Sequence, residues 1–60
     1  MFHVVAVDDN GIMQQLLSMT FSLDARIHGH VFSSGQEALD YAISNHVDLF
    51  IVDWKMPEPY

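Results

Sequence analysis

Three aspartates follow two short apolar segments of the chain. Asp8 and Asp9 come directly after HVVAV, and Asp53 comes directly after LFIV. Carboxylates brought within a few ångströms repel one another, so a proton or a cation must compensate their charge. Oxygen donors without sulfur suit Mg²⁺, which prefers octahedral oxygen coordination, keeps several waters and often shares ligands with phosphate. These residue types therefore predict a Mg²⁺ site, beside which an aspartate could act as a nucleophile and form an aspartyl phosphate.

The first half of the chain predicts a strand, a helix and a weaker strand. HVVAVDD is apolar on consecutive positions, which is typical of a short strand covered on both faces. The helix is expected over residues 12–23 with Asn10 or Asp9 as its cap, and a second strand around residues 28–32 with Gly29 near its start. The predicted helix has one apolar stripe, formed by Ile12, Leu16, Met19 and Leu23.

The second half predicts another helix and a third strand. Ser34-Gly35-Gln36-Glu37 has the pattern of a capping box that opens a helix, and Asn45 with His46 would end it. DLFIVDW repeats the buried-strand pattern, and Pro57 and Pro59 stop regular structure. The expected apolar face of this second helix consists of Ala38, Leu39, Ala42 and Ile43.

The resulting order, β-α-β-α-β, predicts a single α/β domain over residues 1–60 with a parallel sheet and right-handed crossovers. Parallel strands end at one edge of their sheet, where ligands of open α/β sheets bind. Asp8, Asp9 and Asp53 are therefore expected to meet there. Any one of them alone would be better interpreted as a turn or helix-cap residue, but all three at adjacent strand ends favour a site.

Composition excludes several classes of function. Eight acidic residues stand against two basic ones, Arg26 and Lys55, for a formal charge of −6, so nucleic acid and anionic lipid surfaces are not expected ligands. Cysteine is absent, which excludes disulfides and thiolate metal sites. The apolar run from Val4 to Val7 is far shorter than a membrane span. A soluble, cytoplasmic protein is expected.

Three motifs, VVAVDDN, SSGQEALDYA and DLFIVDWKMP, occur in an order and spacing that resemble the amino-terminal half of a receiver domain from a two-component response regulator. The resemblance covers essentially the whole chain. It implies half of a flavodoxin-like, doubly wound parallel sheet, with strand order 2-1-3. It also implies that Asp53 accepts a phosphoryl group from a sensor histidine kinase, a phosphotransfer protein or a small phosphodonor. Asp8, Asp9 and the backbone carbonyl of Lys55 would then bind Mg²⁺ with Asp53, and Pro57 would shape the following loop.

The chain also departs from a receiver. The later half of the family pattern, which supplies a hydroxyl residue, a lysine and two further strands, has no counterpart in these 60 residues. The expected function is thus a truncated receiver module of a phosphorelay that is not an independent enzyme. The alternative is a non-phosphorylated dimerisation or interaction module, or a fragment of a longer regulator. An open third strand predicts a homodimer, formed by antiparallel pairing of that strand or by exchange of elements.

Simpler roles are expected for the remaining distinctive side chains. His28 and His30 alternate on a strand and could bind a metal, but edge-strand surface positions are the favoured interpretation. His46 is interpreted as a helix-end residue and His3 as an amino-terminal surface residue. The predicted packing methionines are Met13, Met19 and Met56. Trp54 could gate the site or cover an interface.

Overall fold

The computed structural model describes residues 1–53 as three strands and two helices. Their order is β-α-β-α-β, as the sequence predicts. The elements are β1 (Phe2–Val7), α1 (Gly11–Ser22), β2 (Ile27–Phe32), α2 (Gly35–Ser44) and β3 (Leu49–Val52).

The three strands form one parallel sheet in the order β2-β1-β3. β1 therefore lies in the centre, and its backbone pairs with both neighbours. The register places Val7 beside Phe32 on one side and beside Val52 on the other. Both predictions, the parallel sheet and its 2-1-3 order, are confirmed.

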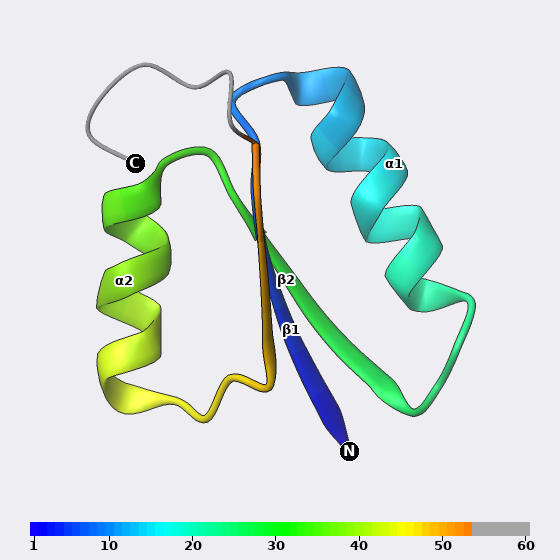
Figure 1. Cartoon of the computed structure of the whole chain (residues 1–60). Coiled ribbons are helices and arrows are strands. Elements are labelled where there is room, and N and C mark those ends of the chain that lie inside the picture. The colour runs from blue at the N-terminus through cyan, green and yellow to red at the C-terminus, as the bar shows by residue number, and fades with distance from the viewer. Residues whose placement is uncertain (54–60) are drawn as a thin grey trace.

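The helices lie on opposite faces of the sheet, with α1 on one side and α2 on the other (Figure 1). This three-layer arrangement follows from two right-handed crossovers that run in opposite directions across the sheet, the first from β1 to β2 through α1 and the second from β2 to β3 through α2. α1 packs mainly on β2, whereas α2 packs on β1 and β2. Both helices begin at the edge of the sheet where β1 and β2 end.

The core is centred on β1. Val4, Val5, Ala6 and Val7 are all at most 3% exposed, which confirms the expectation of a strand covered on both faces. The α2 side of this core is completed by Ala38, with Phe32, Tyr41 and Val47 packed around it. A single central strand thus provides nearly all of the fully buried apolar surface among residues 1–53.

The Asn10 side chain caps α1, as expected, by accepting hydrogen bonds from the backbone N–H groups of Ile12 and Met13.

The predicted apolar stripe of α1 does not pack on the sheet. Instead, Gln14, Leu17 and Phe21 are the partly buried positions of the helix. The stripe residues are 50% to 86% exposed: Ile12, Leu16, Met19 and Leu23. The stripe faces solvent because the side of α1 away from β2 has no covering element among the described residues.

The capping box at α2 forms, with one difference from expectation. The Ser34 hydroxyl accepts a hydrogen bond from the Glu37 N–H at 3.2 Å. The Glu37 carboxylate, however, accepts from the hydroxyls of Ser33 and Ser34 and not from a backbone N–H of the cap. The buried face of the helix is also narrower than predicted: Ala38 is buried, whereas Leu39 and Ile43 are 52% and 82% exposed.

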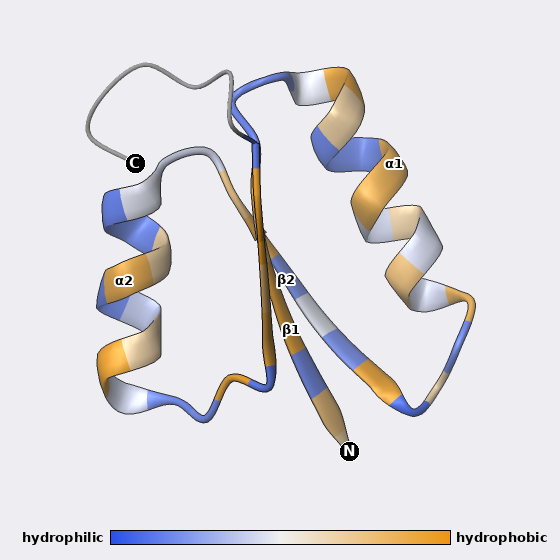
Figure 2. Cartoon of the chain, in the orientation of Figure 1, coloured by the Kyte–Doolittle hydropathy of each residue, from blue (hydrophilic) through white to orange (hydrophobic). Residues whose placement is uncertain are grey.

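β3 differs most from its predicted environment. Its pattern indicates a strand covered on both faces, yet Leu49, Phe50, Ile51 and Val52 are all 37% to 45% exposed. β3 is the edge of the sheet next to β1, and two helices cannot cover three strands fully. Figure 2 shows that β3 is hydrophobic along its whole length. Within residues 1–53, the sheet therefore ends in an exposed, apolar strand where the sequence places a core strand.

Gly29 lies inside β2, where it allows α1 to approach the sheet closely. A Cβ atom at this position would come within 2.6 Å of Cγ and 2.7 Å of Cβ of Phe21. Gly29→Ala is therefore expected to lower the free energy of unfolding by about 1 to 3 kcal/mol, measured by urea denaturation, because the helix must shift outward. Gly11→Ala is the matched control, because Gly11 has no atom within 4 Å of an added Cβ. Equal effects of the two substitutions would contradict the close approach of Phe21.

Within residues 1–53, neither helix has the length or apolar character needed to cross a membrane.

Candidate functional site: an aspartate trio

The register of the sheet brings Asp8 and Asp53 together. Val7 pairs with Val52, so the residue that follows each of them leaves the sheet at the same edge. The backbone still holds both positions, because the Asp8 N–H donates to the Phe32 carbonyl and the Asp53 N–H donates to the Val7 carbonyl. The two carboxylates, 45 positions apart in the chain, are thus fixed beside one another by strand pairing.

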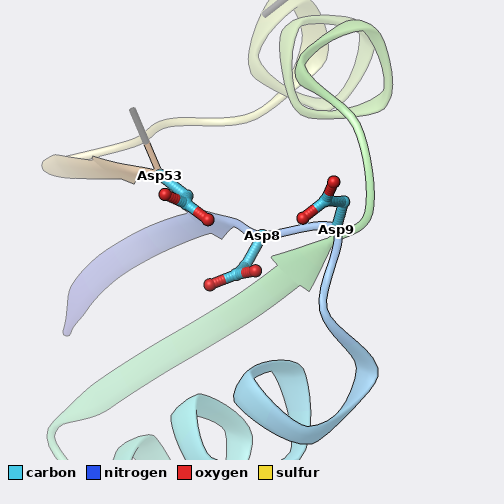
Figure 3. A group of neighbouring side chains, drawn as sticks. All are labelled: Asp8, Asp9 and Asp53. Carbon is cyan, nitrogen blue, oxygen red and sulfur yellow. The ribbon is translucent and has the colours of Figure 1, made fainter. Parts of the chain in front are cut away.

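Asp9 joins this pair from the loop between β1 and α1. One carboxylate oxygen from each of Asp8, Asp9 and Asp53 lies within 4.8 Å of the others (Figure 3). Their environments differ: Asp8 is 7% exposed, Asp53 is partly buried and Asp9 is exposed. The sequence prediction that these three residues meet is confirmed.

The Asp8 carboxylate is held in place by local hydrogen bonds. Its Oδ1 accepts from the Asn10 N–H at 2.9 Å, which forms a short turn before the helix. The Gln14 side chain reaches back from α1 and donates to the Asp8 carbonyl at 2.6 Å. Asp8 therefore does form a turn, which is the ordinary role of an aspartate after a strand. This turn uses Oδ1 of the Asp8 carboxylate.

Two side chains at this edge are not expected there from the sequence. Met13 lines the same hollow as the three aspartates and Asn10, although its apolar neighbours in the sequence predict a packing role. Gln14 positions the Asp8 backbone. Their spacing from Asn10 could have suggested both, since residues three and four positions after a cap lie one turn above it on the helix.

Positive charge from the protein is not close to the trio in the part of the chain that the structure describes. Arg26 lies in the loop before β2, and its guanidinium bonds the Asp24 carboxylate at 2.9 and 3.1 Å. This ion pair raises the pKa of Arg26 and lowers the pKa of Asp24. The Arg26 carbonyl accepts from the N–H of Phe2, at the start of β1, so this cation is at the opposite edge of the sheet.

Four residues of the predicted site region lie outside the described residues. They are Trp54, Lys55, Met56 and Pro57. The expected Mg²⁺ ligation by the Lys55 carbonyl and the loop role of Pro57 therefore stay predictions.

The donor set that the structure does bring together fits a small divalent cation. Three carboxylates supply hard oxygen ligands and leave coordination positions for waters or for a phosphate, which is the usual protein environment of Mg²⁺. Among residues 1–53 the hollow that the three aspartates line is open, so a further ligand could reach a bound ion. The Asp trio can therefore hold a metal ion.

Comparison with protein-family models, with curated proteins and with solved structures found no significant match to this chain.

Proposed function

We propose that this chain is a receiver-like phosphoacceptor module, in which Asp53 receives a phosphoryl group from a phosphohistidine and Asp8, Asp9 and Asp53 hold Mg²⁺. The observation that carries the proposal is that one carboxylate oxygen from each of Asp8, Asp9 and Asp53 lies within 4.8 Å of the others, at the sheet edge where the strand register sets Asp8 beside Asp53. The motifs around them, VVAVDDN and DLFIVDWKMP, supply the resemblance to receivers. The partner is then a sensor histidine kinase or a phosphotransfer protein.

The chemistry is a single displacement at phosphorus. An oxygen of the Asp53 carboxylate forms the new O–P bond while the P–N bond to the donor imidazole breaks, and its electron pair stays on the imidazole nitrogen. Bound Mg²⁺ would neutralise charge on the phosphoryl oxygens during the transfer. The chain's own contribution is to fix Asp53 through its backbone bond to Val7 and to keep Asp8 and Asp9 beside it.

The proposal is tested by incubating the protein with a small phosphodonor and Mg²⁺, and measuring the intact mass. One phosphoryl increment, sensitive to hydroxylamine, is expected because aspartyl phosphates are acyl phosphates. No increment with any phosphodonor would favour a module that is not phosphorylated.

A second function, self-association, is supported by the open edge of β3. Leu49, Phe50, Ile51 and Val52 expose apolar side chains on a strand whose outer backbone groups have no neighbouring strand among residues 1–53. Such edges pair readily with another strand. Two copies related by a two-fold axis would pair their β3 strands antiparallel into one six-stranded sheet, which places the two aspartate trios at opposite ends.

Self-association is tested by measuring the mass of the protein in solution. Light scattering after size exclusion is expected to give twice the monomer mass, and Ile51→Lys should shift the equilibrium towards monomer because charge at a strand edge opposes pairing. Leu23→Lys is the control, since Leu23 is 86% exposed at the end of α1, away from β3. A well-folded monomer at all concentrations would contradict the homodimer.

A further inference from the structure

Three of the four histidines of the chain form a row of rings on the α2 face of the sheet. The strand register pairs His3 of β1 with His28 of β2, and His30 follows two positions later on β2, so all three side chains point to one side. The His3 and His28 rings stack with centroids 5.3 Å apart, and the His28 and His30 rings stack at 5.2 Å. His28 is thus the middle ring of this histidine row.

The histidine row packs against α2 through its last ring. The centroids of the His30 and Tyr41 rings are 4.6 Å apart, and Tyr41 lies 5.5 Å from the Phe32 ring. Tyr41 and Phe32 both pack on the buried core. His3 and His30 are partly buried, whereas His28 is exposed. The row therefore links the amino end of the β1–β2 pair to the packing of α2.

The rings of the row have no carboxylate within ion-pair distance in the part of the chain that the structure describes. The His28 Nδ1 atom contacts the Met1 sulfur at 3.2 Å, which is not a counter-ion. The His3 Nδ1 atom is buried and has no hydrogen-bond partner among residues 1–53. A proton on this nitrogen would create a buried, charged donor without an acceptor, which is costly.

The elements around the row supply no counter-charge to its rings. α2 presents the uncharged ring of Tyr41. Asp48, before β3, bonds the backbone of the row and not a ring: its carboxylate accepts from the His3 N–H at 2.8 Å and contacts His46 Nε2 at 2.7 Å. The His46 ring lies 6.0 Å from the His3 ring and adds positive charge when it is protonated. The Arg26 guanidinium, before β2, is itself positive and pairs with a neighbouring aspartate.

This arrangement is compatible with neutral rings and opposes protonated ones. Neighbouring imidazolium ions of the row would be like charges about one ring spacing apart, and partial burial weakens the screening by water. Desolvation lowers the pKa of His30 below its ordinary value of 6.5, and the charges of His28 and His3 lower it further. The unfolded chain separates the rings and takes up protons without this cost. The stabilisation is therefore complete above about pH 6.5 and is lost as the pH falls below that value.

We propose that the row of His3, His28 and His30 is an acid-sensitive contact, which holds the amino end of the β1–β2 pair and α2 together while its rings are neutral and releases them when neighbouring rings are protonated. Histidine suits this role because it is the side chain whose ordinary titration falls between pH 5 and pH 8. The contact does not depend on the phosphoacceptor function of Asp53, because it uses other residues in another part of the sheet.

The test is urea unfolding at pH 7.5 and pH 5.5, at one ionic strength and without divalent metal. Each additional proton that the unfolded chain binds raises the unfolding equilibrium constant by up to about tenfold per pH unit. We expect about a tenfold rise for the wild-type protein over this interval. The formal charge of −6 makes this informative, since general repulsion weakens as acid neutralises the chain and would stabilise the fold. Asp48 does not interfere, because the His3 N–H and His46 lower its pKa from 3.8.

Variants separate the row from other titrating groups. His28→Gln and His30→Gln are each expected to reduce the acid-dependent rise at least about twofold, because each leaves fewer rings to repel one another. His46→Gln is the matched control: its imidazole is 73% exposed and has Asp48 as counter-ion, so the full rise should be kept. Each variant is compared with itself at the two pH values, so a loss of packing that is present at both cancels.

Three results would overturn the proposal. They are a wild-type equilibrium constant that does not rise, a full rise in either row variant, and the same reduction in His46→Gln as in the row variants. If a variant is unfolded at pH 7.5, an NMR titration of the histidine ring signals of the wild-type protein replaces it. His30 must then titrate below 6.5, with a curve broadened by coupling to its neighbour, and a midpoint at or above 6.5 would refute the contact.

Discussion

Asp53→Asn is expected to abolish the phosphodonor-dependent mass increment completely. The substitution removes the nucleophilic carboxylate oxygen, and an amide cannot form an acyl phosphate under these conditions. The backbone bond from residue 53 to the Val7 carbonyl does not use the side chain and should be kept. The loss of phosphorylation should therefore occur without unfolding, which circular dichroism checks.

The control for this experiment is Asp40→Asn. Asp40 is an exposed acid of α2 whose carboxylate accepts a hydrogen bond from Gln36 and takes no part in the trio. Its substitution changes net charge by the same amount as Asp53→Asn, so both variants are equally affected by any general repulsion of an anionic phosphodonor. Asp40→Asn is expected to be phosphorylated like the wild-type protein.

Persistence of the increment in Asp53→Asn would show that another residue is the acceptor, and peptide mapping would then identify it. A wild-type protein that binds Mg²⁺ but takes up no phosphoryl group would mean that the metal site exists without the transfer function. The two outcomes are distinguishable because metal binding and phosphorylation are measured separately.

Asp8→Asn is expected to remove the stabilisation of the fold by Mg²⁺. A ligand present at about 100 times its dissociation constant stabilises the folded state by about 2.7 kcal/mol, so Mg²⁺ should raise the unfolding midpoint of the wild-type protein clearly. In the variant one of three carboxylates is neutral, and the midpoint should hardly respond to Mg²⁺. Thermal unfolding followed by circular dichroism, with NaCl at matched ionic strength, measures the difference.

The same substitution should have the opposite effect without metal. Asp8 is buried beside two other carboxylates, and each like-charge pair at about 4 Å costs about 1 kcal/mol even in water. The amide that replaces the carboxylate in Asp8→Asn would keep an oxygen to accept from the Asn10 N–H, so the turn is preserved. Metal-free Asp8→Asn is therefore expected to be more stable than the wild-type protein, by about 1 to 2 kcal/mol.

This change of sign is the strongest check on the metal site. A purely structural aspartate would give a variant that is less stable with and without Mg²⁺. A metal ligand gives a variant that is more stable without Mg²⁺ and less stable with it. Equal Mg²⁺ responses of wild type and Asp8→Asn would contradict the site, whatever the phosphorylation result.

Local sequence determined the elements and the aspartate site of this protein. Consecutive valines set β1, the Asn10 cap and the capping box at Ser34 set the helix starts, and parallel strands necessarily end at one edge. These signals are short-range and carried by residue type, so they can be interpreted without coordinates. The meeting of Asp8 with Asp53 then follows from strand order, which the resemblance to receivers supplied.

Only the tertiary structure decided which apolar residues are buried and where the histidines lie. The stripe of α1 and all of β3 have core-like patterns, yet they are exposed because burial depends on which elements cover a face, and no local pattern records that. The pairing of His3 with His28 depends on strand register across 25 residues. Register is set by the packing of the whole sheet, because a slip of one residue would turn every side chain of β2 to the other face.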